Sequence, residues 1–216
     1  MNKSTEKSNV GRNITGEQFA KELLRILGVS DNKCIVVTEK SNKASETVFS
    51  IKNTSKIILR EDSNETRKII TATHEVGHFI NNSKNIVDYK IFKMSGVTLI
   101  ALTVIAILMV LFDEFLINIS TIFLFIVFII GFCFSIWSNQ VKVRDEDGAN
   151  KAAFKVLEEH SDEIFNKYKD SRSWELIRKE AKIQLESGTV KYKDSNYILN
   201  FVSLLPFILF IFFMMN

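Results

Sequence analysis

Two histidines and a glutamate near the middle of the chain have the spacing of a metal-binding motif. His74, Glu75 and His78 form the pattern HExxH within the run ATHEVGHFI. Residues four apart on a helix share one face, so both imidazoles could bind one ion, and the glutamate could reach a water molecule on that ion. These are two of only three histidines in 216 residues. The pattern predicts a zinc site with Glu75 as the catalytic carboxylate.

A helix over about 63–82 must present this motif. Asp62 followed by Glu65 is typical of a helix N-terminus, and the asparagines at 81–82 are typical of an end. Apolar neighbours such as Phe79 indicate a half-buried helix instead of two exposed surface histidines. Gly77 leaves room for another element to approach the motif closely.

The third zinc ligand has several candidates. A catalytic zinc site takes three protein ligands and a water molecule, and an extended histidine motif is excluded because position 84 is Lys84. Glu146 is the expected ligand. It opens a helix predicted over 144–159, where small residues one turn further on would allow close packing against the HExxH helix. The alternatives are Asp145, Asp147 and His160.

This arrangement predicts the hydrolysis of peptide bonds. Bound zinc would polarise the scissile carbonyl and lower the pKa of its water to about 7. Glu75 would accept the water proton and pass it to the leaving amine. A strand at 47–51 or 57–60 could align an extended substrate by main-chain pairing. The residue that stabilises the oxyanion is open among Tyr168, Tyr192 and His160.

The remaining local patterns predict a small α+β domain. Thr15 and Gln18 form a capping box at the start of an amphipathic helix that Gly28 ends. Short β-branched runs predict strands at Cys34–Thr38, Thr47–Ile51 and Ile57–Arg60, with the last two in a small antiparallel sheet. A further helix is predicted over Ser173–Glu186.

Three charge-free apolar runs have the length of membrane-spanning helices. They are Met94–Phe112, Ile117–Trp137 and Tyr197–Met215. No Lys or Arg lies in 94–137 or 197–216, while basic residues flank these stretches. We therefore predict a transmembrane hairpin and a third, C-terminal membrane helix, with both polar parts and the N-terminus cytoplasmic and the C-terminus outside. This predicts a multi-pass protein of the cell membrane in contact with the lipid bilayer.

Charge and cysteine content exclude other classes. The parts 1–93 and 138–196 carry formal charges of about +5 and 0, which does not suggest a nucleic-acid-binding surface. Two cysteines cannot form a disulfide framework. The first residues, MNKSTEKSNVGRN, contain no apolar core of a cleavable secretory signal.

The order of the motifs resembles a family of bacterial membrane peptidases. TG-x2-FA-x2-LLRILG at 15–28, ATHEVGHFI at 72–80 and E-x-x-A-N-x-x-A at 146–153, with predicted membrane helices between and after them, resemble the YugP-like neutral zinc metallopeptidases. The resemblance implies zinc ligands at His74, His78 and Glu146 and a catalytic Glu75. The HtpX-like proteases are similar more distantly and imply the same ligand at 146.

The chain departs from these families at three points. It lacks the N-terminal membrane helix of the YugP-like family and has an additional charged stretch at about 161–193. Asn150 also stands where the HtpX-like pattern has Asp. If residue 150 orients a ligand histidine, an amide there would lower metal affinity by roughly tenfold or more.

Together these observations predict an α+β zincin-like cytoplasmic domain split around a transmembrane helical hairpin. The predicted parts are a flexible tail (1–14), the HExxH half (15–93), the hairpin (94–137), the second half (138–196) and a C-terminal transmembrane helix (197–216). The predicted function is an integral-membrane zinc metallopeptidase acting on polypeptides, membrane proteins among them. The alternative is a weakened or inactive membrane-anchored binding or adaptor protein with the same fold. The sequence predicts neither the substrate nor the oligomeric state.

Overall fold

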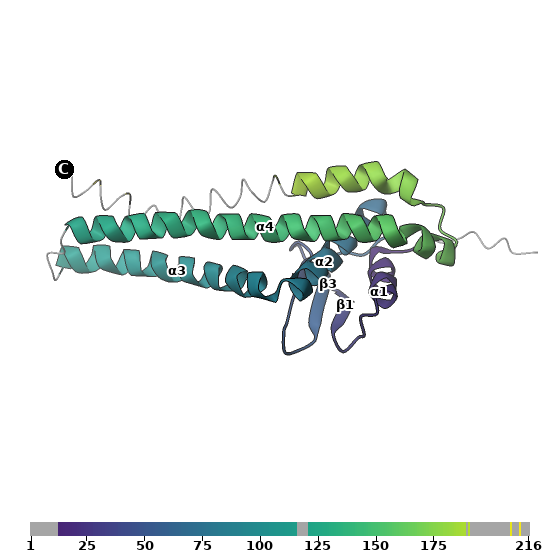
Figure 1. Cartoon of the computed structure of the whole chain (residues 1–216), viewed down its shortest axis with the longest axis horizontal. Helices are drawn as coiled ribbons and strands as arrows, with labels where there is room; N and C mark the ends of the chain where they lie inside the picture. The colour runs from purple at the N-terminus through teal and green to yellow at the C-terminus, as the bar shows by residue number, and fades with distance from the viewer. Residues whose placement is uncertain (1–12, 116–120, 189, 191–207, 209–211, 213–216) are drawn as a thin grey trace, which may run out of the picture. The chain divides into compact units, whose positions relative to one another are not determined.

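The computed structural model describes residues 13–115, 121–188, 190, 208 and 212, and these form helices and one small sheet (Figure 1). They divide into two compact units, one from residues up to Ile80 with Ala149–Glu186, the other from Asn81–Gly148 with the residues from Ser187. A helical stretch also covers 174–188. The elements in chain order are α1 (Gly16–Ile26), β1 (Cys34–Thr38), β2 (Glu46–Val48), β3 (Ser55–Leu59), α2 (Thr66–Lys84), α3 (Ile86–Phe115) and α4 (Thr121–Tyr168).

The sheet is mixed, with β3 in the centre. The strand order is β1-β3-β2. β2 pairs antiparallel with β3, Thr47 opposite Ile57, as the sequence predicts. β1 pairs parallel with β3, Cys34 opposite Ser55, a pairing that the sequence analysis did not assign. Because the sequence pattern identifies strands but not their neighbours, it could not assign β1 to the far side of β3.

Helix α1 begins at the predicted capping box. The Thr15 hydroxyl accepts a hydrogen bond from the main-chain N–H of Gln18 at 3.3 Å, and the Gln18 side chain accepts one from the N–H of Thr15 at 3.1 Å. Phe19 is fully buried, and its ring centroid lies 5.5 Å from that of Phe165 on α4. The apolar stripe of α1 therefore packs against the C-terminal part of α4.

Helix α2 crosses the core of the first unit and approaches α4 closely. Ile69, Ile70 and Val76 on α2 are fully buried. At Gly77 the approach is so close that a Cβ atom would lie 2.3 Å from the main-chain oxygen of Ala149. Only a residue without a side chain fits there, and this confirms the prediction that Gly77 permits close packing.

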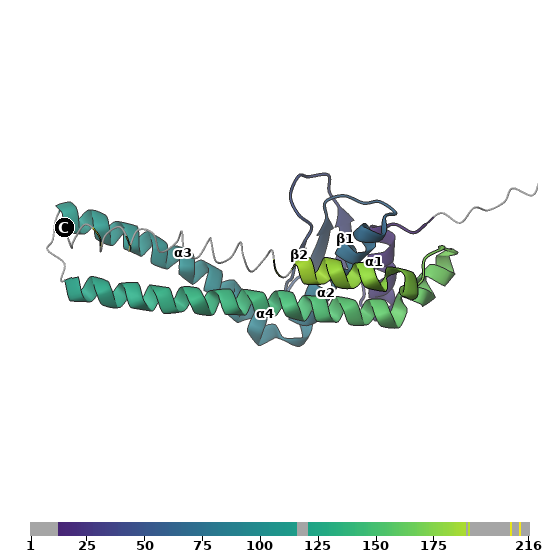
Figure 2. The ribbon, with the colours of Figure 1, turned by 90° about the horizontal axis from the view of Figure 1, so that it is seen from above.

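The helical stretch 174–188, which belongs to the first unit up to Glu186, lies beside α4 in both views (Figures 1 and 2). The Gln184 side-chain amide donates to the Thr71 hydroxyl at 2.9 Å and to the Arg67 main-chain oxygen at 3.2 Å, both on α2. The rings of Trp174 and Phe154 on α4 meet edge to face at 5.1 Å between centroids. This segment is therefore held to both helices that carry the candidate site.

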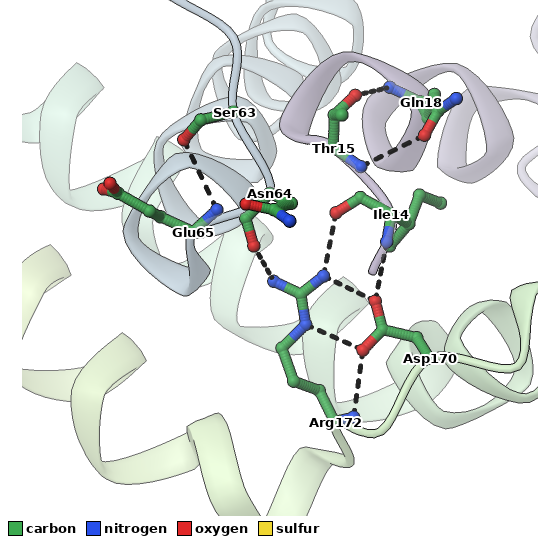
Figure 3. Close-up of polar contacts among 8 residues, drawn as sticks. All are labelled: Ile14, Thr15, Gln18, Ser63, Asn64, Glu65, Asp170 and Arg172. Carbon is green, nitrogen blue, oxygen red and sulfur yellow. Dashed lines mark hydrogen bonds and ion pairs between the residues drawn. The ribbon is translucent and has the colours of Figure 1, made fainter. Parts of the chain in front are cut away.

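A buried ion pair connects Ile14, just before α1, to the turn after α4 (Figure 3). Arg172 forms a bidentate pair with Asp170 and donates to the main-chain oxygens of Ile14 and Asn64, each at 2.8 Å. Asp170 in turn accepts the main-chain N–H of Ile14 at 2.8 Å. The Asp170 side chain is fully buried, and the Arg172 guanidinium lies over the Phe165 ring. The pair joins three segments that are distant in sequence.

Replacing Asp170 by Asn is expected to destabilise the fold by about 3 kcal/mol, because it leaves the buried Arg172 charge without its carboxylate. Burial alone would raise the pKa of Asp170, but hydrogen bonds from Arg172 and from the Ile14 main chain outweigh it and hold the pKa below its usual range. The carboxylate thus stabilises the fold above its unfolded-state pKa, and this contribution is lost as pH falls through the lower folded-state pKa.

Urea unfolding of the wild type and of Asp170→Asn at several pH values tests this prediction. The difference in stability should be largest near pH 7 and should narrow below about pH 4. Asp31→Asn, at an exposed position, serves as the control for removal of one negative charge. Equal stability of Asp170→Asn and wild type at pH 7 would contradict the assigned role.

The structure corrects the membrane prediction. Among the described residues, no helix combines the length and the apolar character needed to cross a bilayer. The described parts of these runs lie in α3 and α4, which also contain charged residues such as Lys93 and Arg144. The predicted transmembrane hairpin at 94–137 is therefore wrong.

The predictions that depended on that hairpin are also contradicted. They are the split zincin-like cytoplasmic domain around membrane helices, the multi-pass location in the cell membrane, and the cytoplasmic and outside placement of its parts. Most of the third predicted membrane helix (197–216) and most of the tail (1–14) lie outside the described residues. What the structure shows is an α+β fold of helices and one three-stranded sheet.

Candidate metal centre

The structure brings His74, His78 and Glu146 together. One ligand atom from each side chain lies within 4.8 Å of the others, and all three side chains are half-buried. These residues could hold a metal ion. The group joins α2 to a position 68 residues beyond His78 along the chain.

Helix geometry explains why these side chains meet. His74 and His78 are one turn apart on α2, and their rings meet edge to face with centroids 4.7 Å apart. Gly77, between them, lies against Ala149, which is three residues after Glu146 on α4. Close approach of the two backbones at this point lets side chains from both helices reach one position.

The donor set fits a zinc ion. Zinc binds imidazole nitrogen and carboxylate oxygen at about 2.0–2.2 Å, so the ligand atoms of a tetrahedral site lie roughly 3.3 Å apart. Ligand atoms within 4.8 Å of one another need only small side-chain rotations to reach that spacing. Two imidazoles and one carboxylate also leave one of four tetrahedral positions for water or substrate.

Glu75 is buried beside this group and contacts the sheet. Its side chain is 5 % exposed, and the hydroxyl of Thr47 on β2 lies 2.8 Å from its Oε2 and 2.8 Å from its main-chain oxygen. The hydroxyl has one hydrogen, so it donates to one of these oxygens at a time. Glu75 on α2 therefore contacts the edge strand β2 of the sheet.

Asn150 connects His74 to the segment 174–188. Its Oδ1 lies 2.8 Å from Nδ1 of His74, and its Nδ2 donates to the main-chain oxygen of Leu185 at 3.0 Å. Asn150 is 8 % exposed. The side chain therefore lies where it can orient a ligand imidazole.

The other sequence candidates lie apart from this group. Asp145 accepts a hydrogen bond from the Asn81 side chain at 3.1 Å, and neither Asp145 nor Asp147 joins the metal-ligand group. His160 and Tyr168 are on α4, 14 and 22 residues beyond Glu146, which corresponds to about 21 and 33 Å along a helix. At these distances neither residue can be a metal ligand or stabilise an oxyanion at this centre. Tyr192 lies outside the described residues.

Two contacts of the centre had no signal in the sequence. The Thr47 hydroxyl reaches Glu75, but a threonine in a strand is ordinary and gives no sign of such a role. The second contact uses the main-chain oxygen of Leu185, which every residue type carries. Both depend on how elements pack, so only the fold could identify them.

Comparison with known proteins identifies no protein similar to this chain. Searches against protein-family models, curated proteins and solved structures found no match for this chain.

Proposed function

We propose that this protein is a zinc-dependent peptide hydrolase. The observation that carries the proposal is the meeting of His74, His78 and Glu146 around one point, with the buried carboxylate of Glu75 next in sequence to the first ligand. Two histidines and a glutamate are the ligand set of many catalytic zinc sites in peptidases. The likeness of the motifs at 72–80 and 146–153 to those of the YugP-like peptidases favours the same proposal.

Zinc is the metal that this donor set favours. Sites for magnesium and calcium are built mainly from carboxylate, carbonyl and water oxygens, whereas imidazole suits zinc and other transition metals. When bound, zinc supplies a Lewis acid that polarises a carbonyl and activates water at neutral pH.

Glu75 carries the proton transfers in this proposal. Its carboxylate accepts a proton from the attacking water and returns it to the nitrogen of the leaving amine, so that the peptide bond breaks and a new carboxyl group forms. The Thr47 hydroxyl, 2.8 Å from Oε2, restricts the rotation of that carboxylate. Restricting its position reduces the ordering needed to reach the transition state.

The edge of the sheet suggests how a polypeptide would bind. In the described sheet β2 pairs only with β3, so its other side is an edge. An extended peptide that adds to this edge forms main-chain hydrogen bonds regardless of its sequence. Thr47 lies on β2 and contacts Glu75, so such a peptide would lie next to the proposed base.

Metal analysis of the purified protein tests the proposal. We expect about one zinc per chain in the wild type, and at least a 100-fold loss of zinc affinity in His74→Ala and in Glu146→Ala, because each loses a ligand of three. His160→Ala removes a histidine far from the centre and should retain zinc. Folded wild-type protein without zinc affinity would contradict the proposal and would favour a non-catalytic binding protein.

A further inference from the structure

We propose that Asn150 is a positioning residue that fixes the tautomer of His74, and that its amide is matched to the Leu185 carbonyl so that aspartate cannot replace it. This inference rests on the proposed function in one respect, since it assigns the fixed imidazole to a metal ligand. The segment 174–188 lies within the additional charged stretch by which the chain departs from the families it resembles. Through Leu185, this segment would help to position a residue of the metal centre.

The first step is the orientation of the amide. The Leu185 main-chain oxygen can only accept a hydrogen bond, so the group that faces it at 3.0 Å must be the NH₂ of Asn150. The opposite end of the amide is then the carbonyl oxygen, and this Oδ1 faces Nδ1 of His74 at 2.8 Å. Leu185 therefore determines which end of Asn150 points to the histidine.

The second step is the tautomer of His74. Because Oδ1 can only accept, Nδ1 of His74 must carry the hydrogen. In a neutral imidazole the lone pair is then on Nε2, which is available to a metal. A metal-binding histidine commonly donates its other N–H in this way, and loss of such a partner costs about 10- to 100-fold in metal affinity.

The third step concerns the aspartate that the HtpX-like pattern has at this position. An ionised carboxylate has no hydrogen to donate, so Asp at 150 would set an oxygen against the Leu185 oxygen. The site is nearly closed to water, with Asn150 8 % and Leu185 6 % exposed. Water therefore has little access to relieve the contact between two acceptors. In this chain the amide suits the centre better than the carboxylate.

The tautomer can be measured directly in the metal-free wild type. Nitrogen-15 NMR of histidine-labelled protein at pH 8 distinguishes a protonated Nδ1 from a protonated Nε2. We expect the His74 signals of the Nδ1–H form, with a hydrogen-bonded Nδ1 proton. Signals of the Nε2–H form at His74 would overturn the inference. This measurement needs no variant and no metal.

Substitutions test the match to Leu185. We expect Asn150→Asp to bind zinc at least tenfold more weakly than wild type and to unfold at a lower temperature, because it places two acceptors together. Asn150→Ala should lose about 10- to 100-fold in zinc affinity. Asn53→Asp adds the same charge at an exposed position and should change neither quantity. Zinc affinity and thermal stability of Asn150→Asp equal to or above wild type would overturn the inference.

The two proposals fail separately. A wild type that binds no zinc but shows the Nδ1–H tautomer would remove the proposed hydrolase and leave the tautomer assignment intact. A wild type that binds zinc and tolerates Asn150→Asp would leave the hydrolase intact and remove the match between the amide and Leu185.

Discussion

Glu75→Gln is expected to reduce peptide hydrolysis by about 100- to 10,000-fold, the range that a general base contributes. Glutamine has the shape of glutamate but cannot accept a proton from the attacking water. Its side-chain oxygen can still accept a hydrogen bond from Thr47, so the local structure should persist. Zinc content should remain that of the wild type, because Glu75 is not one of the three grouped ligands.

The measurement compares cleavage of an unstructured peptide library by zinc-loaded wild type and Glu75→Gln, with zinc content determined on the same samples. Glu65→Gln is the matched control, because Glu65 is exposed and immediately precedes the same helix. This variant should cleave the peptides as the wild type does. Equal cleavage by Glu75→Gln and wild type would eliminate Glu75 as the base and, with it, the proposed mechanism.

Gly77→Ala is expected to destabilise the fold by about 3 kcal/mol, at the upper end of the usual cost of overpacking. The added Cβ would lie 2.3 Å from the main-chain oxygen of Ala149, and a backbone atom cannot move aside as a flexible side chain can. Alanine favours a helix over glycine by only about 1 kcal/mol, so the steric cost outweighs the gain in propensity. The separation of α2 and α4 must increase at this point.

Chemical unfolding and zinc titration together test this prediction. Zinc affinity should fall along with stability, because Ala149 precedes Asn150 and a shift of α4 here moves the group that contacts His74. Gly188→Ala is the matched control, since a Cβ at Gly188 meets nothing within 4 Å. Stability of Gly77→Ala at or above that of Gly188→Ala would show that the close approach of the two helices is not maintained in solution.

Local patterns in the sequence predicted most of the elements of the first unit. The capping box of Thr15 and Gln18 acts within four residues, so the start of α1 could be located without knowledge of the fold. The helix that carries HExxH was expected over about 63–82 and occupies Thr66–Lys84. Such signals depend on neighbours in the chain, which the sequence displays directly.

The full lengths of the helices and the pairing of the strands were predicted less well. The length of an apolar run does not reveal whether its helix continues, and α4 extends without a break from Thr121 to Tyr168 where two separate helices were expected. The transmembrane hairpin was predicted from the length of apolar runs alone, and the described helices contradict it. The parallel neighbour of β3 was missed for a similar reason, because pairing joins residues that the sequence separates.

The candidate ligands could be chosen from the sequence, but their supporting contacts could not. HExxH specifies two ligands by helix periodicity alone. The choice of Glu146 over His160 used small residues at an expected packing face, and the structure groups Glu146 with the histidines. The contacts of Thr47 and of the Leu185 oxygen arise only when the sheet and 174–188 pack around α2 and α4.

The discontinuity of the first unit has a consequence for how the protein is made. His74 and Asn150 are 76 positions apart, and residues of the second unit lie between them in the chain. At about 5–20 residues per second, a ribosome needs roughly 4–15 s to add the residues that separate them. During that time the nascent chain has the HExxH helix without Glu146 or Asn150. The proposed activity is therefore withheld until most of the chain has been synthesised.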